Sequence, residues 1–257
     1  MQYEISGPFK AADLFTLKAH VRKGVVVPDY ANVRAVPRVG KDEPRFSGTG
    51  IYGVLCGGKL IYVGIFTGLG STLFAGSVVH ERWRKHLTFF TMRSPECAAS
   101  PRNLRRILAE LKGAPVAAIA ELVGNDPFTI EDLRNRKIGF ATGTSTQFNK
   151  VRFAAENWNI FQPGNEKEML EQISFVYARF LPETAGLIGS ASRKEAYDFV
   201  KSEWLETRER RLFEKFQPAC NSQTIVPNKD VDVETFLSAL AVEMGLPLLP
   251  RSSAIAA

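Results

Sequence analysis

The feature that most constrains the fold is a short segment, residues 50–66, that predicts a β-hairpin. Two runs rich in β-branched and aromatic residues, 51–55 and 60–63, flank the dipeptide Gly57-Gly58. Paired glycines adopt the positive φ angles that a tight hairpin turn requires, so we expect the two runs to form adjacent antiparallel strands. A small antiparallel sheet is therefore the expected centre of the fold.

Other stretches predict what surrounds this hairpin. Residues 173–181 follow an alternating pattern and are rich in aromatic and β-branched side chains, which indicates a third strand. Apolar residues at helical spacing predict helices at residues 11–23, 78–90, 103–112, 193–216 and 233–244. Residues 115–123 fit either a strand or a buried helix, and residues 137–160 are the least readable. We predict an α+β fold in which a small antiparallel sheet, the hairpin plus a third strand, is flanked by helices.

The composition excludes several classes of protein. Cys56, Cys97 and Cys220 form no C-x-x-C pair, so the spacing of a zinc finger is absent. The first ten residues do not resemble a secretory signal, and nowhere do 18 apolar residues follow one another, so we expect a cytoplasmic protein with no membrane span. The net charge of +6 favours a polyanionic partner, although many proteins that bind no nucleic acid carry as much.

Two tripeptides on the predicted hairpin carry tyrosines. Gly50-Ile51-Tyr52 lies on the first strand and Tyr62-Val63-Gly64 on the second, which places the two tyrosines ten residues apart. Neighbouring strands of a hairpin present side chains to a common face, so Tyr52 and Tyr62 are expected to lie close together.

Two further motifs follow on predicted helices. Arg82 and His86 are four residues apart and so share a helix face. The run ERRLFEKFQPACN begins with Glu209 and ends with Asn221. In their identity and order, these motifs and the two tripeptides resemble the GIY-YIG nuclease family; Val63 in place of isoleucine is a mild departure.

The resemblance implies a nuclease site and covers residues 50–90 and 173–221. It implies that Arg82 faces the scissile phosphate with His86 beside it, that Glu209 is the sole protein ligand of Mg²⁺ (or Mn²⁺), and that Asn221 supports the site. With the local patterns on either side of these segments, we expect three parts of the chain: an N-terminal arm at 1–48, a catalytic domain at 49–222 with an insertion at about 97–171, and a C-terminal helical extension at 223–257.

These residue types suit phosphodiester hydrolysis on chemical grounds as well. Mg²⁺ keeps several waters and often takes only one or two carboxylates, so Glu209 is sufficient. The guanidinium of Arg82 can donate two parallel hydrogen bonds to a phosphate. The phenol of Tyr52 is a poor base unless nearby positive charge from Arg82 or the metal favours the phenolate, with His86 as a possible proton relay.

Basic residues near these motifs are candidates for DNA binding. They are Lys59 in the hairpin turn, Arg84 and Lys85 beside Arg82, and Lys150 and Arg152 in a basic and aromatic stretch. All the candidate residues have ordinary structural interpretations too. The tyrosines could be packing residues, the cations surface charges, Glu209 a salt-bridged residue on a helix face, and Trp83 part of the core. The basic residues between 34 and 45 fit either a solvated edge or a strap along a phosphate backbone.

Within the family the chain most resembles the type II restriction endonucleases, which implies a sequence-specific endonuclease that acts on double-stranded DNA. We expect a homodimer, because each chain offers one site and two strands must be cut. Three alternatives stay open. They are a structure-selective or repair nuclease, a DNA-binding module without catalysis, and a basic globular protein with no nucleic-acid role.

Overall fold

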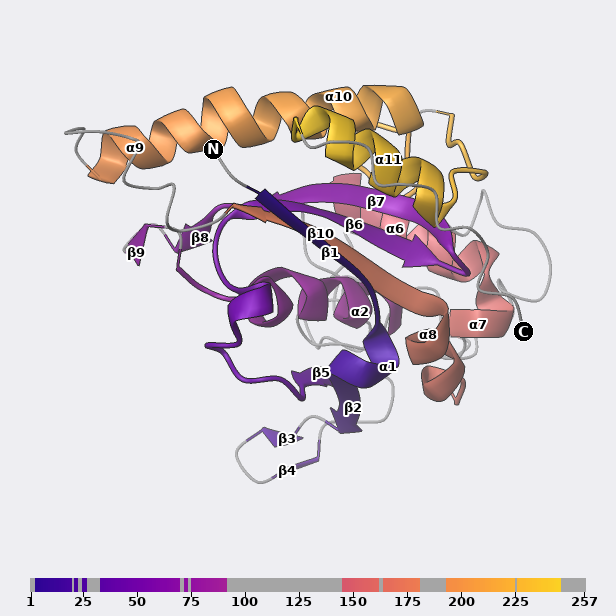
Figure 1. The fold of residues 1–257 in the computed structure, drawn as a ribbon. Helices are drawn as coiled ribbons and strands as arrows, with labels where there is room; N and C mark the ends of the chain where they lie inside the picture. Colours follow the sequence, from indigo (N-terminus) through magenta and orange to yellow (C-terminus); the bar gives the residue numbers. More distant parts are fainter. Residues whose placement is uncertain are drawn as a thin grey trace, which may run out of the picture.

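The centre of the molecule is a four-stranded antiparallel sheet (Figure 1). The computed structural model describes residues 3–19, 21–22, 25–26, 33–69, 72–73, 75–91, 145–161, 164–180, 193–224 and 226–245. Along the sheet the strands are β1 (Tyr3–Lys10), β10 (Ile173–Phe180), β6 (Gly50–Cys56) and β7 (Lys59–Phe66), and each neighbouring pair is antiparallel. The predicted α+β class with a small antiparallel sheet is confirmed, and the sheet has one strand more than the sequence indicated.

The predicted hairpin is formed by β6 and β7. Gly57 and Gly58 make its turn with φ angles of 57° and 75°, which side chains with a Cβ rarely adopt. A register shift between Val54 and Leu55 interrupts the otherwise regular ladder. Because β7 is the last strand of the sheet, its outer edge needs other partners.

The N-terminal segment differs from the expected arm. Residues 3–10 form β1, which pairs with β10 at the other end of the sheet. The helix predicted at 11–23 is wrong: of the described residues in that range only α1 (Ala11–Leu14) is helical, and the chain continues as strand β2 (Phe15–Ala19). Phe15 and Ala11 are fully buried, so tertiary packing of a strand overrides the local helical pattern.

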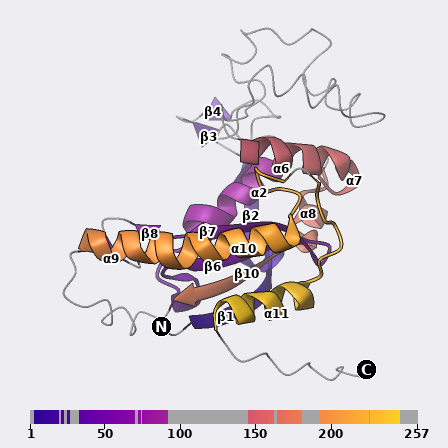
Figure 2. The same ribbon diagram turned by 90° about the horizontal axis from the view of Figure 1, so that it is seen from above.

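The last part of the chain covers one face of the sheet. α9 (Arg193–Phe199), a π-helical stretch (Val200–Glu206) and α10 (Thr207–Phe216) form one continuous rod, and α11 (Val233–Glu243) lies beside α10 (Figures 1 and 2). Asp232 caps α11 by accepting a hydrogen bond from the backbone N–H of Thr235. The helices predicted at 193–216 and 233–244 are confirmed.

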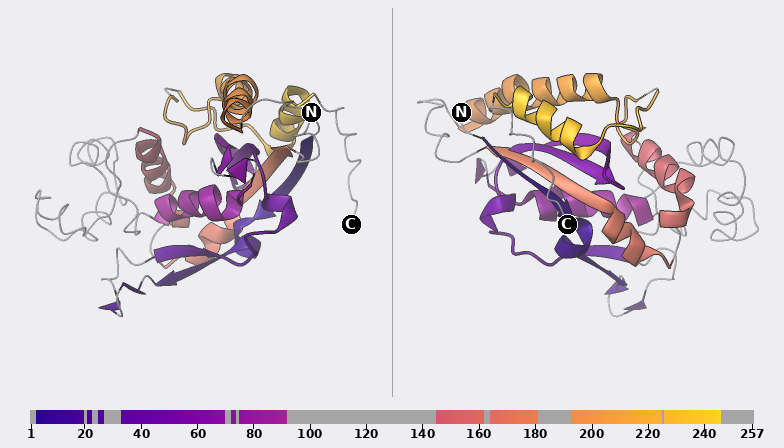
Figure 3. Two further views of the ribbon diagram at one scale, coloured as in Figure 1. Left: turned by 90° about the vertical axis from the view of Figure 1, so that its left-hand side faces the viewer. Right: turned by 45° about the vertical axis from the view of Figure 1, so that its right-hand side comes forward.

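The opposite face is covered by helices from the middle of the chain. A π-helical turn (Val79–Trp83) leads into α2 (Arg84–Thr91), which confirms the helix predicted at 78–90. α6 (Ser145–Glu156) packs beside α2, followed by α7 (Trp158–Phe161) and α8 (Glu166–Gln172) (Figure 3). These three helices belong to the segment that matched no motif.

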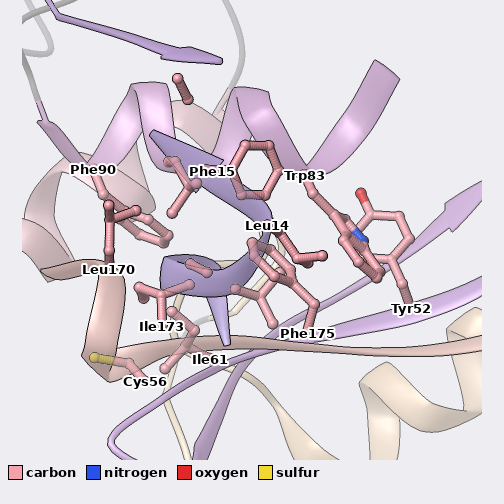
Figure 4. Packing of buried hydrophobic residues seen from close by; sticks show 14 of the residues in the cluster. Leu14, Phe15, Tyr52, Cys56, Ile61, Trp83, Phe90, Leu170, Ile173 and Phe175 are labelled. Carbon is pink, nitrogen blue, oxygen red and sulfur yellow. The ribbon is translucent and has the colours of Figure 1, made fainter. Parts of the chain in front are cut away.

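Two apolar clusters hold these layers together. On the α2 face the indole of Trp83 stacks on the ring of Phe175 at 4.5 Å, and Tyr52 lies at the edge of the same cluster (Figure 4). Trp83 is fully buried, so its interpretation as core is confirmed. On the other face Leu212 and Phe236 pack against the sheet.

Smaller elements lie around this core. β5 (Val33–Pro37) pairs with β2, β3 (Val21–Arg22) with β4 (Val25–Val26), and β8 (Gly68–Leu69) with β9 (Thr72–Leu73), while Pro44–Phe46 forms one 3-10 turn. Among the described helices, none is long and apolar enough to cross a membrane. The elements predicted at 103–112 and 115–123 lie outside the described residues.

Candidate active site

The two tyrosines of the hairpin lie on the face of the sheet that α2 covers. Tyr52 of β6 is directly opposite Gly64 of β7, and its ring stacks on that of Tyr62 with centroids 6.0 Å apart. A Cβ on Gly64 would lie 2.5 Å from the Tyr62 ring and 2.9 Å from the Tyr52 hydroxyl. The position therefore has room for glycine alone, which gives a physical reason for the last residue of the second tripeptide.

His86 of α2 completes this aromatic group. Its Nε2 lies 3.0 Å from the hydroxyl of Tyr52, and its ring centroid is 4.5 Å from that of Tyr62. Burial, followed by the positive charges of Lys150 and Arg82, lowers the pKa of His86 well below its usual value. The imidazole is thus neutral, and the tautomer decides whether it donates to Tyr52 or accepts from it.

Glu209 reaches the site from α10, on the other side of the sheet edge. It lines an open pocket of about 320 Å³ together with Tyr62 and Asn221. Burial first, and the neighbouring carboxylate of Glu206 second, raise the pKa of Glu209 to about 7, whereas Arg82 opposes the shift. Residues far apart in the sequence therefore surround a single cavity.

Arg82 is exposed in the π-helical turn before α2. Its positive charge opposes the rise in the pKa of Tyr52, of Tyr62 and of Glu209, although Arg82 does not itself line the pocket. A cation in that place can neutralise a phosphate that enters the pocket.

Burial decides the protonation of the phenols. It raises the pKa of Tyr52 well above 10, with further increases from Tyr62 and Glu209, and Arg82 offsets only part of this. It also raises the pKa of Tyr62 to about 12. In the protein without a bound cation, Arg82 alone therefore does not favour a phenolate at Tyr52, because desolvation outweighs its attraction.

The two tyrosines differ in their access to the cavity. Tyr62 lines the pocket, whereas Tyr52 is only 3% exposed and lies behind it. The hydroxyl that a ligand meets first is therefore that of Tyr62.

Asn221 holds the segment after α10 against the edge strand. Its Oδ1 accepts a hydrogen bond from the backbone N–H of Val63 at 3.0 Å, and its Nδ2 donates to the carbonyl of Val63 at 2.8 Å. The N–H of Cys220 donates to the carbonyl of Ile61 beside it. The amide of Asn221 is thus used by the backbone of β7, so this residue supports the site by positioning.

Helix α6 contributes two residues that the sequence did not assign to the active site. Asn149 donates to the backbone carbonyl of Asn221 at 2.5 Å, and the ammonium of Lys150 lies 4.6 Å above the ring of Tyr62 and 5.2 Å above that of Phe89. Lys150 is only 5% exposed, so its placement differs from that of a surface phosphate contact. Its position over Tyr62 is a cation–π geometry instead.

The other predicted DNA-binding residues lie outside the pocket lining. Lys59 is exposed and donates to the carbonyl of Asp230 at 3.4 Å, and Arg152 is paired with Glu156 at 3.8 Å. Lys85 is exposed on α2, and Arg84 has a buried Nε with no hydrogen-bond partner in the described structure. These four cations therefore do not line the pocket that contains Glu209.

A cation would have to be held by few protein ligands. Within the described ranges no three His, Cys, Asp or Glu side chains form a metal-binding group. Glu209 and Glu206 line one pocket, and the negative charge of Glu206 helps to raise the pKa of Glu209, an effect that a divalent cation would relieve. This donor set fits Mg²⁺, which often takes one or two carboxylates and fills its shell with water and phosphate oxygens.

Comparisons with known protein families, characterised proteins and solved structures found no match for this chain.

Proposed function

We propose that this protein is a metal-dependent endonuclease that hydrolyses DNA phosphodiester bonds. The observation that carries the proposal is the pocket at the edge of β7, which Tyr62 and Glu209 line from different elements, with Arg82 close enough to affect both electrostatically. Phosphodiester hydrolysis needs charge neutralisation on the phosphate and a proton acceptor for the attacking water. Groups for both tasks come together at the pocket. The order of these residues along the chain resembles that of the GIY-YIG family.

Glu209, with Glu206 beside it, would hold Mg²⁺ or Mn²⁺. Once bound, the cation would supply positive charge for the negative charge that develops on the phosphate. Arg82 binds a nonbridging phosphate oxygen from the exposed end of its helix.

The tyrosines and His86 move the proton of the attacking water. As the water oxygen bonds to phosphorus, its proton passes to the Tyr62 oxygen, the Tyr62 proton to Tyr52, and the Tyr52 proton to Nε2 of the neutral imidazole. The bond between phosphorus and the leaving oxygen breaks at the same time, the leaving alkoxide takes a proton from solvent water, and the imidazolium returns its proton to the solvent. The stacked rings of Tyr52 and Tyr62, with centroids 6.0 Å apart, and the 3.0 Å separation between the Tyr52 hydroxyl and Nε2 of His86 support this route. It requires no phenolate in the free protein.

Double-strand cleavage of the restriction type requires two such sites. One chain supplies one Glu209, so a homodimer on double-stranded DNA would cut both strands. The β2–β5 sheet carries Lys18 and Arg34 in directly opposed, exposed positions, a like-charge pair that a phosphate backbone would stabilise.

The test is cleavage of plasmid DNA by purified protein with Mg²⁺, with Glu209→Gln and the matched control Glu214→Gln. Glu214 is an exposed carboxylate on the same helix outside the pocket. We expect discrete products from the wild type and the control, and a loss of rate of about 100-fold or more with Glu209→Gln. Undiminished cleavage by Glu209→Gln, or no cleavage of plain or branched DNA by the wild type, would refute the proposal.

A further inference from the structure

The wall of the pocket next to Glu209 contains an arginine to which the proposed reaction gives no role. Arg210 is exposed and lines the pocket with Phe213, and the residues Ser222 and Gln223 line it from the turn after α10. All the pocket-lining residues are described, and Arg210 is the one cation among them, beside two carboxylates. The chemistry of the pocket therefore changes from acidic to basic along α10.

The neighbouring arginines on the same helix have partners in the protein, and Arg210 differs from them. Arg208 donates to the carbonyls of Glu243 and Trp204 at 2.8 and 3.1 Å. Arg211 forms an ion pair with Glu243 at 3.5 Å. In the part of the chain that the structure describes, Arg210 makes no such bond, so its guanidinium contributes nothing visible to the fold and remains available to a ligand.

The groups around Arg210 suit a phosphate. A guanidinium presents a planar set of donors that matches two phosphate oxygens, and the Ser222 hydroxyl and Gln223 amide can add donors from the opposite side. Residues 209 and 210 project about 100° apart around a helix, so Arg210 addresses a different part of a ligand from Glu209. The cavity of about 320 Å³ is at the lower end of the range of small-molecule sites, roughly 300–1,000 Å³, which suits one nucleotide unit.

We infer that Arg210, Ser222 and Gln223 form a subsite for a DNA backbone phosphate adjacent to the one that is cleaved. The inference rests on the proposed function, and it specifies how the strand lies in the pocket: the reacting phosphate against Glu209 and Tyr62, its neighbour against Arg210. The subsite sets the register of the strand and takes no part in the chemical step.

The test compares Arg210→Gln with Arg211→Gln, two adjacent substitutions that remove the same charge from the same helix. Binding of a labelled duplex is measured by fluorescence anisotropy in EDTA, which prevents metal-dependent cleavage, over a range of KCl concentrations. We expect Arg210→Gln to weaken binding about 10-fold and to reduce the salt dependence by about one counterion, and Arg211→Gln to change affinity less than about 2-fold. In cleavage assays Arg210→Gln should raise KM and leave kcat unchanged.

Equal effects of the two substitutions, or no effect of Arg210→Gln, would overturn the subsite, and so would a wild type that binds no DNA. If Arg210→Gln weakens DNA binding while the wild type never cuts DNA, the subsite is supported and the nuclease function is refuted. If the wild type cuts DNA and the two variants behave alike, the nuclease function is supported and the subsite is refuted. Inorganic phosphate serves as the second probe. If inorganic phosphate competes with DNA for the wild type but not for Arg210→Gln, the site is assigned to free phosphate. If inorganic phosphate does not compete with DNA, the site is assigned to the strand.

Discussion

Replacing Asn221 with alanine should destabilise the edge of the sheet by an amount that the structure defines. The change removes two hydrogen bonds and leaves the N–H and the carbonyl of Val63, a fully buried residue, without partners. Each unsatisfied buried group costs about 1–3 kcal/mol. Because β7 is an edge strand that water can reach, we expect the free energy of unfolding to fall by an amount near the lower end of the summed range for the two groups, about 2–4 kcal/mol. A chain of this size should lose roughly 5–15 °C in Tm.

The assay combines thermal unfolding with hydrogen exchange at a single amide. In the wild type the N–H of Val63 should exchange slowly, and in Asn221→Ala it should exchange fast. Asn221→Asp keeps an acceptor for that N–H but sets a carboxylate against the carbonyl of Val63, so it should be no more stable than Asn221→Ala. Asn228→Ala, which removes an exposed local bond to the N–H of Asp230, is the matched control and should change Tm little. A Tm of Asn221→Ala within 1 °C of the wild type would refute this reasoning.

Three further predictions follow from the site. Gly64→Ala should force Tyr52 and Tyr62 apart, because a Cβ there would lie under 3 Å from both, so cleavage should fall while circular dichroism keeps the native secondary structure; native activity would contradict the packing. Glu209 has a raised pKa of about 7 against 4.5, so in metal-free protein its contribution to stability is present below pH 4.5 and is lost as pH rises through 7. The free energy of unfolding of the wild type relative to Glu209→Gln should therefore fall across that window, and a flat difference in urea titrations would argue against the burial of Glu209. Lys150→Met should lose about 1–2 kcal/mol of unfolding free energy in urea, Lys150→Arg should keep most of it, and equal losses would show that the charge over Tyr62 is unimportant.

Local patterns predicted the parts of the fold that depend on local physics. The hairpin followed from Gly57-Gly58 between two β-rich runs, and the long rod of α9 and α10 followed from helical periodicity. Strand β1 pairs with β10, more than 160 residues away, and no local pattern reports such a pairing. The failure at Phe15 has the same cause, since burial against the core decided its conformation.

The sequence predicted which residues form the candidate site, but only part of their placement and burial. Spacing on the hairpin placed Tyr52 and Tyr62 together, as the structure has them. The mixture of basic and aromatic residues around Lys150 assigned this residue to a DNA-binding surface, because burial cannot be read from a segment without clear periodicity. Arg210 stood in a run of charged residues that fits a salt-bridged helix face equally well, and only the partners of Arg208 and Arg211 single it out.

Sequencing of the DNA ends that the purified protein produces is the most direct test of the central claim, that Glu209 and Tyr62 border a pocket in which a phosphodiester is hydrolysed. Wild-type protein and Glu209→Gln are incubated in parallel with a genomic DNA sample, with Mg²⁺ and with EDTA. The account predicts new ends with wild type and Mg²⁺ only, gathered at one short sequence if the enzyme is of the restriction type and at branched or damaged positions if it is a repair nuclease. Ends at background level with the wild type, or the same ends from Glu209→Gln, would contradict it.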